Sequence, residues 1–132
     1  HRPLDLVVLM LGTNDLKQRF SLSAFDIAQG AAVLVRTIQS SQTGRDGASP
    51  ITLLMAPPPT TTLTEYAEML EGAGPKSARF AAHYGGVAKQ LGCPFLDTGA
   101  VIVSSPLDGV HFEASEHLKL GQAVAAKVKT LL

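Results

Sequence analysis

Apolar residues follow two patterns that alternate along this chain. Residues 4–11 form a continuous apolar run, which is typical of a strand buried on both faces, and residues 51–56 form a second buried run. Residues 94–97 favour a short third strand. Segments with apolar residues at helical spacing lie after each of these runs. The alternation predicts an α/β fold in which parallel strands are joined by right-handed helical crossovers.

Three helices are predicted from the periodic segments. Ser23 can cap the first helix, with Asp26 completing a weak capping box. The second helix spans about residues 76–91 and stops at Gly92, and the third spans about residues 114–131. The three apolar stripes are Ile27, Ala31, Leu34 and Ile38; Phe80, Tyr84, Val87 and Leu91; and Leu120, Val124, Val128 and Leu131.

Polar residues of possible chemical use follow the predicted strands. Residues 12–15 (Gly-Thr-Asn-Asp) close the first strand, and residues 57–59, all proline, end the second. Asp108 and His111 lie in the loop after the third strand. Functional groups gather at the carboxyl ends of parallel strands, so we expect all of these residues on one rim of the sheet.

Composition and charge narrow the class of protein. The 132 residues suit one domain or one large piece of a domain, and the formal net charge is zero, with no basic stripe that would favour nucleic acid. The longest apolar runs are far shorter than the roughly 20 residues of a membrane-spanning helix. Cys93 is the only cysteine, which excludes an internal disulfide and fits a reducing compartment. No signal peptide is visible, and we expect a cytoplasmic protein.

The pair Asp108 and His111 has the chemistry of an acid–base unit. Imidazole can take a proton from a hydroxyl and return it, because its ordinary pKa is about 6.5. A carboxylate three residues away can reach the far ring nitrogen, fix the tautomer and stabilise the imidazolium. A turn aspartate followed by a histidine beside a helix is the alternative, and for this pair taken alone it is the stronger interpretation.

Asn14 is a candidate oxyanion donor. A side-chain amide aimed into the rim can donate to a developing oxyanion, an interaction worth roughly 3–4 kcal/mol where it has been removed in other enzymes. For Asn14 taken alone, an Asx turn or helix cap after a strand is the stronger interpretation. Asp15 fits that turn or cap role better than a catalytic one.

The other reactive residue types form no recognisable site. No cluster of cysteine, histidine or carboxylate residues resembles a metal site, and we expect neither a metal nor a cofactor. His83 and His117 fall on predicted helices without compact ligand spacing. A serine nucleophile is not identified: Ser104 and Ser105 lack a strand-to-helix setting and are interpreted as turn residues, and Ser21, Ser23 and Ser115 as loop or cap residues.

The two motifs together resemble the SGNH, or GDSL-type, hydrolase family over essentially the whole chain. The apolar strand leading into residues 12–15, the proline run and residues 108–112 (Asp-Gly-Val-His-Phe) are similar to the bacterial arylesterase/acyltransferase branch. The resemblance implies a serine esterase for short-chain or aryl esters that can pass the acyl group to alcohols and that often forms larger oligomers. It implies Asp108 and His111 as acid and base, Asn14 with Gly12 as oxyanion groups, and Pro58, Pro59 and Val110 as substrate contacts.

The resemblance also implies that part of the site is missing from this chain. The block that carries the nucleophile (Gly-Asp-Ser) and the block with a second oxyanion glycine belong upstream and are not found here. We therefore expect residues 1–132 to be the C-terminal portion of a single flavodoxin-like three-layer α/β/α domain, with five parallel strands in the order 2-1-3-4-5, of which this chain supplies strands three to five.

Four expectations follow for function. The chain alone is inactive and is an unstable monomer, because its first strand lies in the middle of the intact sheet. Its partners are a complementary N-terminal segment with the serine, a small ester and further copies in a homo-oligomer, without nucleic acid or membrane. Residues 57–74 form the wall of the acyl or alcohol pocket and part of a subunit contact. The alternative is a non-catalytic α/β module that kept the fold and binds a partner or ligand.

Overall fold

A computed structural model describes residues 2–132 of the chain as a parallel sheet between helices. The strands are β1 (Leu6–Leu9), β2 (Ile51–Ala56) and β3 (Phe95–Asp97), and the helices are α1 (Ala24–Gln39), α2 (Ala73–Ser77), α3 (Phe80–Leu91) and α4 (Ala114–Val128). Short 3-10 turns cover Thr13–Leu16, Gln18–Phe20, Arg45–Gly47 and Thr98–Ala100.

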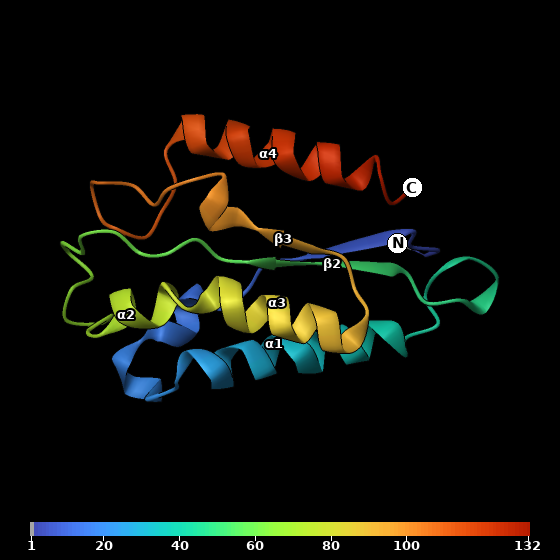
Figure 1. The fold of residues 1–132 in the computed structure, drawn as a ribbon, viewed down its shortest axis with the longest axis horizontal. Coiled ribbons are helices and arrows are strands. Elements are labelled where there is room, and N and C mark those ends of the chain that lie inside the picture. The colour runs from blue at the N-terminus through green and yellow to red at the C-terminus, as the bar shows by residue number, and fades with distance from the viewer. Residues whose placement is uncertain (1) are drawn as a thin grey trace.

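The strands are parallel and lie in the order β1-β2-β3. Leu6 pairs with Ile51, and Leu54 pairs with Phe95. Helices α1 and α3 cover one face of the sheet and α4 lies over the other, so the fold has three layers (Figure 1). The predicted α/β class, the parallel pairing and the adjacency of these three strands are confirmed.

The apolar core lies between the sheet and the pair α1 and α3. Phe80 and Tyr84 from α3 and Val35 from α1 are completely buried there, together with Leu16 from the turn after β1 and Leu54 from β2. Each side chain of this size contributes about 1.5–3 kcal/mol when it leaves water. This layer therefore supplies most of the apolar burial and fixes the turn that follows β1.

Helix α1 begins as the sequence predicts. The Ser23 hydroxyl accepts from the Asp26 N–H, and the Asp26 side chain accepts from the Ser23 N–H, which is the reciprocal capping box. The predicted stripe is wrong at one position, because Leu34 is exposed while Val35 is fully buried. The buried face is wide enough to include Ala28 and Ala32 as well, since α1 packs against both the sheet and α3.

The predicted second helix is divided in the structure. Helix α2 ends at Ser77, and the Arg79 N–H donates to the carbonyl of Lys76, three residues back, so the α-helical ladder is interrupted before α3 starts at Phe80. The predicted stop is confirmed, because Gly92 closes α3 with a φ of 63°. The first strand is shorter than the apolar run, since β2 pairs only with Leu6–Leu9.

The face of the sheet toward α4 is less completely covered. Val8 of β1 is 41% exposed, which corrects the expectation that residues 4–11 are buried on both faces. Of the α4 residues only Glu116 is buried, at 7% exposure, and the stripe predicted for this helix, Leu120, Val124 and Val128, is half-buried. Among residues 2–132, no helix combines the length and the apolar character needed to cross a membrane.

Candidate active site

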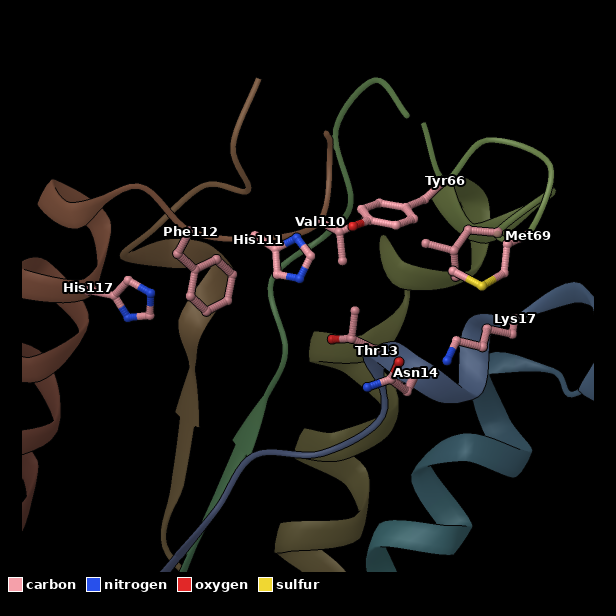
Figure 2. Close-up of a pocket in the computed structure, with 10 residues that line it drawn as sticks. Thr13, Asn14, Lys17, Tyr66, Met69, Val110, His111, Phe112 and His117 are labelled. Carbon is pink, nitrogen blue, oxygen red and sulfur yellow. The ribbon is translucent and has the colours of Figure 1, made fainter. Parts of the chain in front are cut away.

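A pocket of about 630 Å³ opens at the carboxyl end of the sheet. The turn after β1, the segment before α2 and the loop before α4 each supply part of its wall, so residues distant in the sequence meet there (Figure 2). Its lining residues are Thr13, Asn14, Lys17, Tyr66, Met69, Leu70, Val110, His111, Phe112 and His117. The predicted meeting of Asn14 with His111 on one rim is therefore confirmed.

Asp108 and His111 form the expected carboxylate–imidazole pair. The His111 Nδ1 lies 2.7 Å from Asp108 Oδ2 and donates to it, which leaves Nε2 as the ring nitrogen that can take a proton. The other oxygen, Oδ1, accepts from the N–H groups of Val110 at 2.7 Å and His111 at 2.9 Å. These backbone bonds, and then the imidazole, lower the pKa of the Asp108 carboxyl.

The surroundings of the two side chains differ. The Asp108 side chain is 17% exposed, whereas the His111 side chain is 68% exposed, so the carboxylate is anchored below an imidazole that stays accessible. Tyr66 packs edge-on against the His111 ring with centroids 5.7 Å apart. This arrangement suits an imidazole that exchanges protons with a group bound in the pocket.

The segment before α2 holds the loop that carries this pair. Gly109 has a φ of 84°, and a Cβ at this position would lie 2.6 Å from the carbonyl oxygen of Thr62. The Thr61 N–H donates to the Gly109 carbonyl at 3.0 Å, and the Thr64 hydroxyl donates to the Leu107 carbonyl at 2.7 Å. Contact between the two segments therefore requires glycine between the aspartate and the histidine.

Ser105 ties the same loop together from within. Its side chain is buried, and its hydroxyl donates to the Glu113 carboxylate while accepting from the Leu107 N–H. Its own N–H donates to the His111 carbonyl at 2.6 Å, and its carbonyl accepts from the Gly109 N–H at 2.8 Å. Ser104 is also buried and donates to the Pro59 carbonyl. Ser105 thus begins the turn of residues 106–108, as the sequence predicts, whereas Ser104 lies before that turn.

The Asn14 turn is fixed by the apolar core. Gly12 has a φ of 134°, and a Cβ there would overlap the Tyr84 hydroxyl oxygen, so the turn needs glycine for both its conformation and its packing. That hydroxyl donates to the Leu11 carbonyl at 2.6 Å, and burial raises the Tyr84 pKa. Leu16, at the end of the turn, is fully buried.

Four of the predicted site residues do not line the pocket: Asp108 lies behind His111, and Gly12, Pro58 and Pro59 lie elsewhere. Gly12 lines a separate hollow of about 310 Å³ beside α1, where it makes room for Tyr84. Pro58 is buried, and the exposed Pro59 faces a smaller hollow near Gly99. Pro58 and Pro59 do not line this pocket, and their contact with a substrate stays a prediction; Val110 lines the pocket together with Tyr66, Met69 and Leu70.

Other pocket residues were not recognised in the sequence as site residues. Lys17 and His117 belong to no motif, and the sequence places His117 only on a predicted helix. The His117 ring lies beside Phe112 with ring centroids 5.5 Å apart. Residues 57–74 had been expected to form a pocket wall, and Tyr66, Met69 and Leu70 do line it. The length and apolar content of that segment are the sequence features that predict its place in the pocket wall. For Lys17, the only sequence feature that indicates a place in the pocket is its position about one turn after Asn14.

No serine lines this pocket within residues 2–132. The hydroxyls of Ser104 and Ser105, the nearest in sequence to Asp108, are occupied by the bonds described above. The part of the chain that the structure describes also contains no group of three or more histidine, cysteine or carboxylate side chains that could hold a metal ion.

Comparisons with known proteins agree with this geometry. The model of the GDSL-like lipase/acylhydrolase family matches residues 1–120. The chain belongs to this family. A comparison with curated proteins finds no significant match.

Solved structures of esterases share the fold. The aryl esterase of M. smegmatis is 38% identical to this chain with a TM-score of 0.95, and a carbohydrate acetylesterase from Sinorhizobium meliloti is 34% identical with a TM-score of 0.95. This chain is covered completely in both comparisons and spans 63% of the length of each of those chains.

Proposed function

We propose that this chain provides the base, the orienting acid and an oxyanion donor of a serine esterase. The observation that carries the proposal is the Asp108–His111 pair, bonded through Nδ1 at 2.7 Å, in the same pocket as Asn14. Carboxylate, imidazole and amide converging on one cavity at the carboxyl edge of a parallel sheet suit acyl transfer. Membership of a family of lipases and acylhydrolases supports the same reaction class.

Each of these residues has a definite part in the proposed reaction. His111 Nε2 takes the proton of a serine hydroxyl as that oxygen attacks the ester carbonyl, and then gives the proton to the departing alcohol. Asp108 keeps Nδ1 protonated and stabilises the imidazolium. The Asn14 amide donates to the carbonyl oxygen as negative charge develops on it. Water, or an alcohol, then accepts the acyl group by the reverse sequence.

The attacking serine, in this proposal, belongs to a complementary N-terminal segment with a Gly-Asp-Ser block. Three observations support this part of the proposal: the absence of a serine from the pocket lining, the exposure of Val8 on β1, and the 63% coverage of the aryl esterase. Association with such a segment would pair the free edge of β1 and cover the apolar surface beside it.

Short-chain and aryl esters are the proposed substrates. The pocket wall combines aromatic and aliphatic side chains, Tyr66, Met69, Leu70, Val110 and Phe112, which suits a small apolar acyl or aryl group. The similar solved structures are described as an aryl esterase and a carbohydrate acetylesterase, and we extend only the ester class to this chain. Acyl transfer to alcohols and assembly into a homo-oligomer complete the proposal.

Turnover of p-nitrophenyl acetate tests the proposal. The 132-residue chain alone should show none, and turnover should appear when its complementary segment is added. A fluorophosphonate should then label the serine of that segment. In the assembled protein, His111→Ala should abolish most turnover, whereas His83→Ala, a matched change on α3 outside the pocket, should leave it unchanged.

The results separate this function from a non-catalytic binding module. Serine-dependent turnover by the 132-residue chain alone would refute the assignment of the nucleophile to another segment. Assembly that gives neither turnover nor labelling would refute the esterase proposal and favour the binding module.

A further inference from the structure

Lys17 is the one lysine or arginine in the lining of the pocket within residues 2–132. The lining contains no aspartate or glutamate, and its other titratable residues are His111, His117 and Tyr66. Asp108 lies behind His111 and is bonded to its imidazole and to backbone N–H groups. The pocket wall therefore carries positive charge without a carboxylate of its own.

No carboxylate of the described residues pairs with Lys17. The carboxylate ion pairs within residues 2–132 join Arg45 to Asp5, Lys119 to Glu116 and His111 to Asp108. Glu65 and Glu68, on the neighbouring segment, line an adjoining hollow that also contains Arg19. An ammonium in a partly apolar wall gains most from an anion that enters the pocket with it.

The backbone holds Lys17 in a fixed position between two walls of the pocket. Its N–H donates to the Asn14 carbonyl at 3.3 Å, and the N–H of the next residue, Gln18, donates to the Met69 carbonyl at 2.9 Å. Leu16, immediately before it, is buried in the core. Figure 2 shows the Lys17 ammonium on the Asn14 side of the cavity. A group bound there would lie close to the ester carbonyl that Asn14 contacts in the proposed reaction.

We propose that Lys17 makes this pocket selective for esters that carry a carboxylate or another anionic group near the ester carbonyl. The proposal rests on the esterase function proposed above and names the substrate class of the same site. The side chain acts as a specificity residue: its ammonium donates to the anionic group of the bound ester, while His111, Asp108 and Asn14 perform the reaction.

Two matched pairs of esters test the proposal on the assembled protein. 4-Carboxyphenyl acetate and 4-carbamoylphenyl acetate differ in charge on the alcohol side, and mono-4-nitrophenyl adipate and 4-nitrophenyl hexanoate differ on the acyl side. In at least one pair, the ratio of kcat/KM for the anionic ester to that for the neutral ester should fall about tenfold in Lys17→Met. Lys17→Arg should retain the ratio, and added salt should reduce it in the wild type.

A matched control separates a local effect from a general one. Lys89→Met removes the same charge from the last turn of α3, outside the pocket, and should leave both ratios unchanged. A fall of both ratios in this control equal to that in Lys17→Met would mean that overall charge sets the preference and would overturn the proposal. Ratios unaffected by Lys17→Met in both ester pairs would overturn it as well.

A binding measurement keeps this inference distinct from the esterase proposal. 4-Hydroxybenzoate and 4-hydroxybenzamide are titrated while the backbone amide resonances of Asn14, Lys17 and His111 are followed by NMR. The carboxylate should bind more tightly than the amide in the wild type and about equally in Lys17→Met. That result without turnover of any ester would refute the esterase and support the anion site, whereas turnover with carboxylate and amide bound alike would refute the anion site alone.

Discussion

The candidate site has two parts, the Asn14 turn and the Asp108–His111 loop, and different interactions hold each of them in place. The turn that carries Asn14 is held by apolar packing: Leu16 is completely buried, and Gly12 lies against the buried Tyr84. The loop that carries Asp108 and His111 is held by hydrogen bonds, and the His111 side chain is 68% exposed. The Asn14 turn is thus stabilised by packing against the apolar core, whereas the Asp108–His111 loop is stabilised by hydrogen bonds near the surface.

This difference predicts different responses to substitution and to pH. Packing against a filled core resists displacement in every direction, because any movement opens a void or forces an overlap. Hydrogen bonds at an accessible loop contribute about 1 kcal/mol each, but they fix direction and depend on protonation. We therefore expect a change in the packing of the Asn14 turn, at Gly12 or Leu16, to appear mainly in stability. Loss of the exposed Asn14 amide, or displacement of the Asp108–His111 loop, should appear mainly in turnover.

The largest expected effect comes from Asn14→Ala in the assembled protein. If the amide donates to the oxyanion, kcat on p-nitrophenyl acetate should fall by about 10²–10³. The free energy of unfolding should change by less than about 0.5 kcal/mol, because Asn14 is exposed and the turn keeps its packed neighbours. Steady-state kinetics and urea denaturation measure the two quantities. Wild-type rates in this variant would reduce Asn14 to a turn residue.

The next largest effect should come from a substitution that disturbs the packing of the Asn14 turn. Gly12→Ala should lower the free energy of unfolding by about 2–4 kcal/mol, because its Cβ meets the pinned Tyr84 hydroxyl and its φ is 134°. Gly30→Ala is the matched control, since a Cβ in that part of α1 meets nothing within 4 Å, and it should stabilise by up to about 1 kcal/mol. Denaturation curves in which the two variants behave alike would show that the turn does not depend on this contact.

The features of the site that the sequence predicts correctly are those set by short local motifs or by strand order. The apolar runs and the rule that functional groups follow parallel strands were enough to place Asn14 and His111 on one rim, and the Asp108 spacing was enough for its bond to the imidazole. The Ser23 cap and the Gly92 stop were equally local and were found. In each case the deciding interaction lies within a few residues or follows from strand order.

Contacts between distant segments were outside the reach of such reasoning. The resemblance implies Gly12 as an oxyanion group beside Asn14, and this role stays a prediction; local sequence does not reveal that Tyr84 of α3 packs against Gly12. The resemblance implies Pro58 and Pro59 as substrate contacts, but the residues of this segment that line the pocket come later in the chain and include Tyr66 and Met69. These placements depend on how helices pack on the sheet, and periodicity does not fix that packing.

A smaller effect should come from a substitution that displaces the hydrogen-bonded Asp108–His111 loop. In Gly109→Ala, the new Cβ would lie 2.6 Å from the Thr62 carbonyl oxygen at a φ of 84°, so the loop must move away from the segment that holds it. We expect kcat to fall about tenfold or more, since small displacements of a base are costly, with about 1–2 kcal/mol lost in stability. Gly121→Ala on α4, where a Cβ meets nothing within 4 Å, should affect neither kcat nor folding adversely. A Gly109 variant with normal kcat would show that the loop tolerates displacement.

The smallest expected effect is the dependence of stability on the charge of Asp108. Its pKa is lowered chiefly by the N–H groups of Val110 and His111 and then by the imidazole. A carboxyl whose pKa is lower in the folded state stabilises the protein above its unfolded pKa, which is about 3.9, and loses that contribution as the pH falls through the lower folded value. Asp108→Asn keeps an oxygen acceptor for the two N–H groups but removes the charge.

The free energy of unfolding of the wild type should therefore exceed that of Asp108→Asn at pH 6. The gap should shrink as the pH falls below about 4 and vanish at still lower pH, where the carboxyl is protonated in both states. Urea denaturation from pH 2 to 7 measures it, with Asp46→Asn in the Arg45–Gly47 turn as a control for general charge. A difference in unfolding free energy that persists unchanged to the lowest pH would mean that the shape of the Asp108 side chain, rather than its charge, stabilises the loop. The two parts of the site would then differ in their packing and hydrogen-bond geometry, and not in their dependence on charge.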